Sequence, residues 1–276
     1  MTHLVQDPRP EPVVAKPVVL RADNITVRFG GLVAVNNVSF DIPDGSVVSL
    51  IGPNGAGKTT FFNALTGLYH VDAGRVMLGS RNITGLPPHK IASIGIARTF
   101  QNIRLFGLMT AEENLKVAMH SHLKSGIVRT ILRTPGQRRE ERKAHEVALE
   151  LLDFVGIGKT ATEYARNLSY GDQRRLEVAR ALALKPKVLL LDEPTAGMNP
   201  RESAEFTDFV RRLQRERQVS VLLIEHDMSV VMRVSDRITV LDRGEKIAEG
   251  GPDDIKNNER VIEAYLGKSG TAASHE

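Results

Sequence analysis

The run from Gly52 to Thr60 constrains this chain most, because it fits the phosphate-binding loop pattern G-x-x-x-x-G-K-[ST]. The apolar run 46–51 before it predicts a buried strand, and the run 60–65 after it predicts a helix. A glycine-rich loop in that context can wrap its backbone N–H groups around a phosphate at the helix N-terminus. The alternative is a glycine-rich turn that matches by chance. The predicted phosphate-binding residues are Gly52, Pro53, Asn54, Gly55, Ala56, Gly57, Lys58, Thr59 and Thr60.

Three side chains in and before this loop have predicted roles. Lys58 would reach the β- and γ-phosphates of a nucleotide, and the hydroxyl of Thr59 would hold Mg²⁺. Upstream, the runs 20–29 and 33–42 predict an antiparallel pair of strands. Phe29 ends the first of them, where its ring would stack on adenine at the rim of the site. The alternative for Phe29 is an ordinary core residue.

Composition sets broad limits on the fold and on the compartment. A length of 276 residues suits one large α/β domain or two small ones, and 41% hydrophobic residues are enough for a real core. The chain has no cysteine, which excludes disulfides and Cys-ligated zinc. No apolar run reaches the roughly 18 residues of a membrane span. A net charge of +4 permits contact with anionic lipid or nucleic acid but indicates neither.

Polar side chains follow three further predicted strands, 94–100, 188–191 and 219–224. Ligands collect at the carboxyl ends of parallel strands, so these positions are candidate site residues. Gln101 would reach the metal or the attacking water, although a glutamine after a strand is usually a loop residue. Asp192 would bind Mg²⁺ and Glu193 would accept a proton from water. His226 would lie near the γ-phosphate; a lone histidine is more often structural.

Two further segments allow two interpretations each. Ser169 and Asp172 have the spacing of a capping box at a helix N-terminus, where the Ser169 hydroxyl and the Gly171 N–H could instead bind a phosphate. The segment 119–145 is basic and amphipathic. Such a segment docks on a membrane surface or on a partner, or it is a solvated helical insertion.

The order of these motifs resembles the nucleotide-binding subunit of ABC transporters over residues 18–267. In that resemblance the phosphate loop is Walker A, 188–193 is Walker B with the catalytic glutamate, Gln101 is the Q-loop and His226 the switch histidine. The run 168–172 matches the LSGGQ signature. Two departures are Tyr170 for a signature glycine with Asp172 at its fifth position, and Asn199 for the usual aspartate after Walker B.

A finer resemblance is to the ATPases of branched-chain amino acid importers. The segments that carry it are 97–106, 151–156, 196–200 and 261–267. It implies a domain over 18–267, with a helical subdomain at about 102–186 and the basic insertion at about 119–145. The tails 1–17 and 268–276 are predicted to be disordered or flexible, the first because it is rich in proline.

The resemblance implies an α/β fold, the P-loop NTPase fold of ABC ATPases. It has a mostly parallel core sheet, an N-terminal antiparallel β subdomain and an α-helical signature subdomain. It implies ATP hydrolysis with ATP and Mg²⁺ as cofactors. Two ATP molecules would lie between two ATPase subunits, so that Ser169 and Gly171 act in trans. Other expected partners are membrane permease subunits and, indirectly, a substrate-binding protein, at the cytoplasmic face of the inner membrane.

The resemblance also places a docking groove after Gln101, where Leu105 and Phe106 would contact a permease helix and Arg104 would cap it. The alternative is that both apolar residues fill the local core. Two alternative functions are open. One is an exporter or lipid-extraction ATPase, and the other is a soluble ABC ATPase acting on nucleic acid or ribosomes. A single set of motifs without sustained heptads disfavours the second, so no nucleic-acid partner is expected.

Overall fold

The computed structural model describes residues 16–120 and 135–266. Residues 1–15 of the predicted N-terminal tail, 121–134 of the basic insertion and 267–276 at the C-terminus lie outside the described residues. Lys16 and Pro17, the last two residues of the predicted tail, contact the turn after the second strand. The Lys16 ammonium donates to the Gly45 carbonyl at 3.2 Å, and the Pro17 carbonyl accepts from the Asp44 N–H at 2.7 Å.

The centre of the molecule is a six-stranded sheet in which four consecutive pairs of neighbours are parallel, and the pair at one edge, formed by the last two strands of the chain, is antiparallel. Three neighbouring strands, β3 (Val47–Ile51), β8 (Ser220–Ile224) and β7 (Val188–Asp192), are buried at every residue, which explains their mostly apolar sequences. Its strands, in spatial order, are β10 (Glu245–Gly250), β9 (Arg237–Asp242), β3 (Val47–Ile51), β8 (Ser220–Ile224), β7 (Val188–Asp192) and β6 (Ile96–Arg98).

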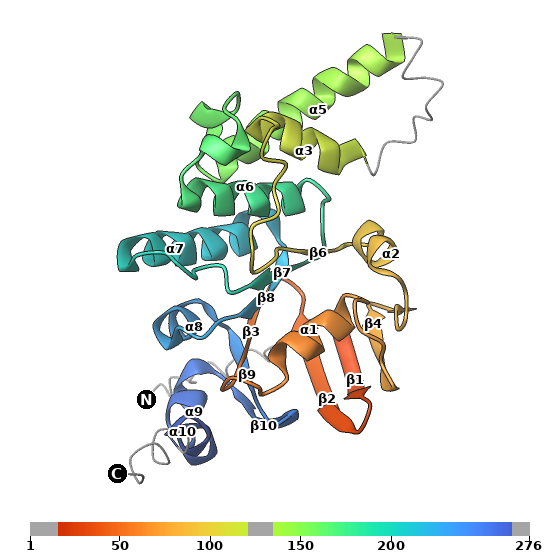
Figure 1. Ribbon diagram of the computed structural model, residues 1–276, viewed down its shortest axis with the longest axis vertical. Coiled ribbons are helices and arrows are strands. Elements are labelled where there is room, and N and C mark those ends of the chain that lie inside the picture. The colour runs from red at the N-terminus through yellow and green to blue at the C-terminus, as the bar shows by residue number, and fades with distance from the viewer. Residues whose placement is uncertain (1–15, 121–134, 267–276) are drawn as a thin grey trace, which may run out of the picture.

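Successive residues of this sheet serve two different hydrophobic cores. Leu189 and Leu191 face a core shared with the helices of the upper part of Figure 1, whereas Leu190 faces the core around α1 (Lys58–Leu65). Helix α1 fills the space between the two sheets with Phe61, Phe62 and Leu65. The central sheet is thus covered on both faces, as a largely parallel sheet requires.

A second, antiparallel sheet lies beside α1 (Figure 1). It confirms the predicted antiparallel start, with Phe29 paired to Leu32 across the turn. Its Phe40 meets Phe61 of α1 edge to face, with ring centroids 5.7 Å apart. Its strands in spatial order are β2 (Leu32–Pro43), β1 (Val18–Phe29), β4 (Ala73–Leu78) and β5 (Arg81–Asn82).

Three helices, α3, α5 and α6, gather at the end of the molecule opposite to the antiparallel sheet (Figure 1). The start of α3 has a capping box, because the Thr110 N–H donates to the Glu113 carboxylate at 2.8 Å and the Thr110 hydroxyl accepts from the Glu113 N–H at 3.2 Å. The helices not yet bounded are α2 (Pro88–Ser93), α3 (Ala111–His120), α5 (Pro135–Phe154), α6 (Tyr170–Leu182), α7 (Pro200–Arg217), α8 (Met228–Val234), α9 (Pro252–Lys256) and α10 (Glu259–Leu266), with 3₁₀ turns at Gly158–Thr160 and Ala165–Asn167.

The strand predicted at 94–100 is shorter than expected. Gly95 has φ +115°, outside the extended range, so β6 begins only at Ile96. At the other end Phe100 leaves the sheet, and its N–H donates to the carboxylate of Glu177 at 3.1 Å instead of to a neighbouring strand. The predicted strand is therefore correct in position and wrong in length.

Candidate functional site

The phosphate loop connects β3 to α1, as predicted, and two of its glycines cannot be replaced without a clash. A Cβ on Gly52 would lie 2.0 Å from the Leu241 carbonyl oxygen, and one on Gly57 would lie 2.6 Å from that of Ala34. Gly57 also has φ +94°, a conformation that side chains disfavour. The turn therefore needs glycine at both positions to bring β9, β2 and the start of α1 together.

The start of α1 is suited to an anion. Gly57 is its N-cap and provides no side-chain cap, and its first turn contains no acidic residue. The N–H groups of that turn therefore form a positive helix end, and no side chain of the first turn neutralises it. The Lys58 ammonium lies back over the loop, where it donates to the carbonyls of Gly52 at 2.6 Å and Pro53 at 3.0 Å.

A pocket of about 560 Å³ opens over this loop. Phe29 lies at its rim with 47% of its surface exposed, so it is not an ordinary core residue. Its ring packs edge to face on Tyr69, with centroids 5.2 Å apart. Arg243, in the turn between β9 and β10, lines the pocket too, and no motif in the sequence marks it. The lining residues are Phe29, Leu32, Val33, Ala34, Asn54, Gly55, Ala56, Gly57, Lys58, Thr59, Thr60, Glu193 and Arg243.

Three of the predicted residues from strand ends meet beside this pocket. The amide nitrogen Nε2 of Gln101 donates to Oε2 of Glu193 at 3.0 Å. Nδ1 of His226 lies 3.9 Å from the same oxygen. Glu193 has φ +44°, a strained conformation for a residue with a side chain, and such strain is concentrated at functional sites. This backbone conformation directs the Glu193 carboxylate toward the pocket over the phosphate loop.

Asp192, the last residue of β7, is buried beneath this cluster. Its carboxylate lies 3.5 Å from Nη2 of Arg98, and Nη1 of the same guanidinium donates to Oδ1 of Asn63 at 2.9 Å. Burial is the largest effect on the Asp192 carboxyl and raises its pKa, while Arg98 opposes the increase. A buried carboxylate with only one long ion-pair contact is a fitting oxygen ligand for Mg²⁺, as is the hydroxyl of Thr59 at the pocket.

No group of three His, Asp or Glu side chains within 16–120 and 135–266 could hold a metal alone. A Mg²⁺ ion held by Thr59, Asp192 and Gln101 would therefore need additional ligands, and nucleotide phosphates are of that kind. Glu225, next to His226, has a different role. It is buried and accepts from the N–H and the hydroxyl of Thr195 at 3.0 and 2.6 Å, which fixes the loop after β7.

Ser169 and Gly171 do not join the cluster within this chain. Neither lines the pocket over the phosphate loop. The Ser169 hydroxyl accepts from the Asp172 N–H at 3.1 Å, as predicted for a cap, and donates to the Asp172 carboxylate at 2.8 Å. The neighbouring Tyr170 hydroxyl donates to the Ala196 carbonyl at 3.0 Å, so the start of α6 is tied to the loop that follows Glu193.

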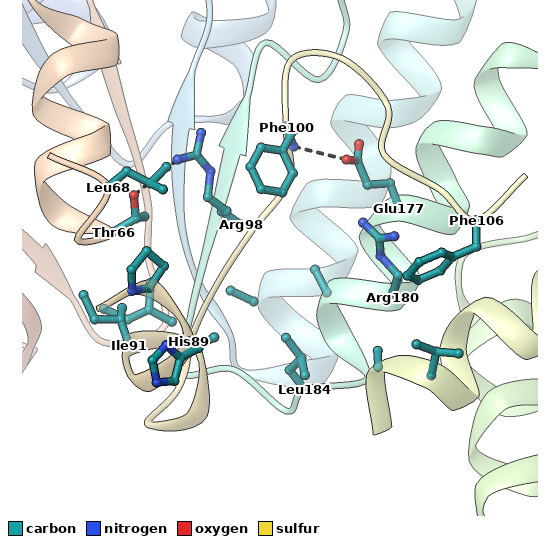
Figure 2. A pocket seen from close by; sticks show the side chains of 17 residues that line it. Thr66, Leu68, His89, Ile91, Arg98, Phe100, Phe106, Glu177, Arg180 and Leu184 are labelled. Carbon is teal, nitrogen blue, oxygen red and sulfur yellow. Dashed lines mark hydrogen bonds between the residues drawn. The ribbon is translucent and has the colours of Figure 1, made fainter. Parts of the chain in front are cut away.

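A separate, largely apolar groove of about 420 Å³ lies between α2, α3, α6 and the segment after β6 (Figure 2). Phe106 lines it with 47% of its surface exposed, and the Arg180 guanidinium lies 5.9 Å from its ring. The core interpretation is therefore wrong for Phe106. Leu105 is partly buried and packs on the helical core, and the guanidinium of Arg104 stacks on the Phe100 ring at 4.5 Å.

No helix in the part of the chain that the structure describes has the length and apolar character that crossing a bilayer requires.

Comparison with known families and proteins gives consistent matches over nearly the whole chain. The model of the ABC transporter family matches residues 35–196, and the model of the branched-chain amino acid ATP-binding cassette transporter matches residues 245–271. The high-affinity branched-chain amino acid transport ATP-binding protein BraF of Pseudomonas aeruginosa is 49% identical over 251 residues, which are 91% of this chain and 98% of BraF.

Two solved structures are similar as well. The ADP conformation of MJ1267, an ATP-binding cassette of an ABC transporter, has a TM-score of 0.79 and 31% identity, covering 91% of this chain and 99% of MJ1267. MJ0796, a bacterial ABC transporter cassette solved as a dimer, has a TM-score of 0.71 and 26% identity, covering 84% of this chain and 98% of MJ0796.

Proposed function

Because the chain belongs to the ABC transporter ATP-binding proteins and is an ATPase of that family, we propose that it powers uptake of branched-chain or other hydrophobic amino acids across the inner membrane. The observation that carries the ATPase function is the meeting of Glu193, Gln101 and His226 beside the phosphate-loop pocket. The substrate class is supported by BraF and by the family model at residues 245–271. Both favour import over the exporter and nucleic-acid alternatives.

In this proposal the phosphate loop binds the ATP phosphates through the N–H groups at the start of α1. Lys58 exchanges its contacts with the loop carbonyls for contacts with the β- and γ-phosphates. Thr59, Asp192 and Gln101 hold Mg²⁺, which neutralises phosphate charge when bound. Phe29, exposed at the rim, stacks on the adenine ring.

Glu193 is the residue that accepts a proton from the attacking water. Its carboxylate lies at the pocket and is oriented by the Gln101 amide. His226 is close enough to the same carboxylate to contact the water or the γ-phosphate once both are in place. The residues thus position the water and the phosphate and stabilise the charge that develops between them.

The site is completed by a second ATPase subunit. Ser169 and Gly171 lie away from the pocket of their own chain, at the positive N-terminus of α6. In a dimer of the kind seen for MJ0796 they would face the γ-phosphate bound to the other chain. Asn199 caps α7, accepting from the N–H groups of Arg201 and Glu202 at 3.0 Å each, so the departure from aspartate retains a helix cap.

The membrane partner is a permease subunit, which docks a short cytoplasmic helix in the groove lined by Phe106. An apolar groove with one exposed aromatic residue suits the apolar face of such a helix. The subunit would then be peripheral, at the cytoplasmic face of the inner membrane, and would meet a substrate-binding protein only through the permease.

The composite site is tested by mixed dimers. A Ser169→Arg chain paired with a Lys58→Ala chain should retain one intact site, because the two lesions fall on the same site. Both changes on one chain, paired with an unchanged chain, should spoil both sites. Nucleotide occupancy per dimer, measured with trapped radiolabelled ATP, distinguishes the two arrangements. Equal occupancy in both mixed dimers would contradict action in trans.

Docking and transport are tested with Phe106→Asp in proteoliposomes that contain the permease subunits. Leucine uptake and membrane association should be lost, while ATP binding by the free subunit is retained. Leu108→Asp is the matched control, because Leu108 is 73% exposed in the same loop and does not line the groove. A folded Phe106→Asp subunit that still supports leucine uptake would exclude docking at this groove.

A further inference from the structure

A buried ion pair lies inside α6, on the side that faces the segment after β6. Arg174 and Glu177 have side chains that are only 2% and 1% exposed, and Nη1 of Arg174 lies 3.1 Å from Oε2 of Glu177. Charged residues are seldom buried so completely unless they are paired. The two residues follow Ser169 by five and eight positions, so the pair belongs to the helix that carries the signature residues.

One further hydrogen bond of this pair stays within α6, from Nη2 of Arg174 to the Tyr170 hydroxyl at 3.3 Å, and three go to the backbone of the segment between β6 and the groove. Nη1 of Arg174 donates to the Phe100 carbonyl at 2.7 Å, and Nη2 donates to the Gln101 carbonyl. The Glu177 carboxylate accepts from the Phe100 N–H at 3.1 Å (Figure 2). Both backbone groups of Phe100 and the carbonyl of Gln101 are therefore held by one ion pair.

The two ends of the pair reach two different sites. Glu177 lines the groove together with Phe106 and Arg180 (Figure 2). Arg174 holds the backbone of Gln101, whose side chain donates to Glu193 at 3.0 Å. One continuous set of contacts therefore runs from the floor of the groove to the carboxylate beside the phosphate-loop pocket.

We infer that Arg174 and Glu177 are positioning residues. The occupant of the groove determines where they hold Gln101, and the position of Gln101 in turn determines that of Glu193. A helix bound beside Glu177 would shift α6 or hold it in place, and the ion pair would move with α6. The backbone at Phe100 and Gln101 would follow, because it is hydrogen-bonded to the pair. The inference rests on the proposed docking of a permease helix in this groove.

The chemistry of the pair separates this role from plain stabilisation. A buried ion pair seldom stabilises a protein more than well-packed apolar residues of the same size. Unlike apolar residues, an ion pair makes directional hydrogen bonds. Here those bonds go to an irregular segment that no longer pairs with the sheet. Phe100 N–H would otherwise lack a strand partner. The pair therefore fixes the geometry of the segment and makes it move with α6.

The test uses the subunit assembled with its own membrane subunits in nanodiscs, and compares ATP turnover there with turnover of the free subunit. The double variant Arg174→Met with Glu177→Leu removes the ion pair without leaving a buried charge. Its complex should still form, but the change in turnover caused by the membrane subunits should shrink by about tenfold. Amide exchange at Phe100 should accelerate, which reports the lost contact directly.

The matched control is Arg175→Met with Glu205→Leu. This neighbouring pair also starts on α6, with nitrogen and oxygen 3.6 Å apart, but it reaches α7 instead of the segment at Phe100. The control should respond to the membrane subunits as the unchanged protein does. A merely structural role for Arg174 and Glu177 would lower the melting temperature of the double variant and leave the response of its folded fraction unchanged. That result would overturn the inference.

If the double variant does not fold, Glu177→Gln decides. It keeps an acceptor for the Phe100 N–H and removes the charge that holds Arg174, so it should retain the fold and weaken the response. An unchanged response would overturn the inference. Phe106→Asp, measured in parallel, separates this inference from the proposed docking. If Phe106→Asp remains bound and coupled, the docking proposal fails; if it dissociates while the pair variants respond normally, only the inference fails.

Discussion

The phosphate-loop pocket and the Phe106 groove differ in how they are built. The pocket takes most of its lining from one contiguous run, Asn54 to Thr60, and its chemistry comes from backbone N–H groups and one lysine. The groove takes its lining from α2, α3, α6 and the segment after β6, and its surface is mostly apolar side chains. A phosphate is the same in every ATP molecule, whereas a partner helix differs between transporters.

The two sites therefore tolerate different kinds of substitution. A backbone site depends on the few glycines that allow its turn, so Gly52 and Gly57 have no tolerated replacement. A side-chain site can be retuned position by position without changing the fold. Under the proposed docking, the same ATPase core would serve different permeases by changes limited to residues such as Phe106.

The largest effect is expected from Glu193→Gln, because it alters chemistry at the pocket and leaves both binding surfaces intact. ATP hydrolysis should fall by about 10²–10⁴-fold, the usual contribution of a general base. ATP affinity and membrane association should stay unchanged, which equilibrium binding and co-purification would measure. Turnover within a few-fold of the unchanged protein would remove Glu193 from its proposed role.

A smaller effect is expected from Lys58→Ala, which tests whether the backbone alone suffices to bind phosphate. The substitution removes a charge-assisted contact worth about 1.5–3 kcal/mol, so ATP affinity should fall by roughly 10–150-fold. Isothermal titration with ATP and ADP measures it. Docking in the groove should be unaffected. An unchanged affinity for both nucleotides would contradict the assignment of Lys58 to the phosphates.

The smallest of these effects is expected at Phe29, the aromatic residue at the rim of the pocket. Phe29→Ala should weaken ATP binding by about 1–3 kcal/mol through lost stacking. Phe29→Tyr, which keeps the ring, is the control and should bind ATP normally. Since the ring lies at the rim, inorganic triphosphate should bind both variants equally well. Equal loss with triphosphate would mean that Phe29 supports the fold of the pocket instead.

Much of the central sheet was predictable because its buried strands are mostly apolar. The runs that became β3, β7 and β8 had no competing interpretation, and Gln101, Glu193 and His226 were found because each follows a strand of the central sheet. The first two strands of the antiparallel sheet were predicted from their alternating pattern, whereas the pairing of β4 and β5 with them was not. The length of β6 was not, because the loss of the ladder at Phe100 depends on a distant carboxylate.

The buried pair on α6 was missed for a physical reason. Leu176, Ala179 and Ala183 mark one apolar face, and Arg174 and Glu177 lie opposite to it, where a surface helix has its solvated side. Helix α6 is instead buried on both sides. The opposite charges three positions apart were the available signal, but their backbone partners, Phe100 and Gln101, lie more than 70 residues away. Similarly, Arg98 beside Asp192 could not be found from spacing.

The hydroxyl of Tyr170, which is bonded to the Ala196 carbonyl, gives the unlabelled protein a built-in optical reporter. The chain contains no tryptophan and only four tyrosines, so tyrosine emission is not masked by energy transfer to indole. A phenol that donates to a carbonyl fluoresces less than one that is free in water. When α6 moves relative to the loop after Glu193, this bond changes, and the emission near Tyr170 changes with it. A movement of α6 on ATP binding would therefore be visible in a stopped-flow fluorimeter, with Tyr170→Phe as the blank.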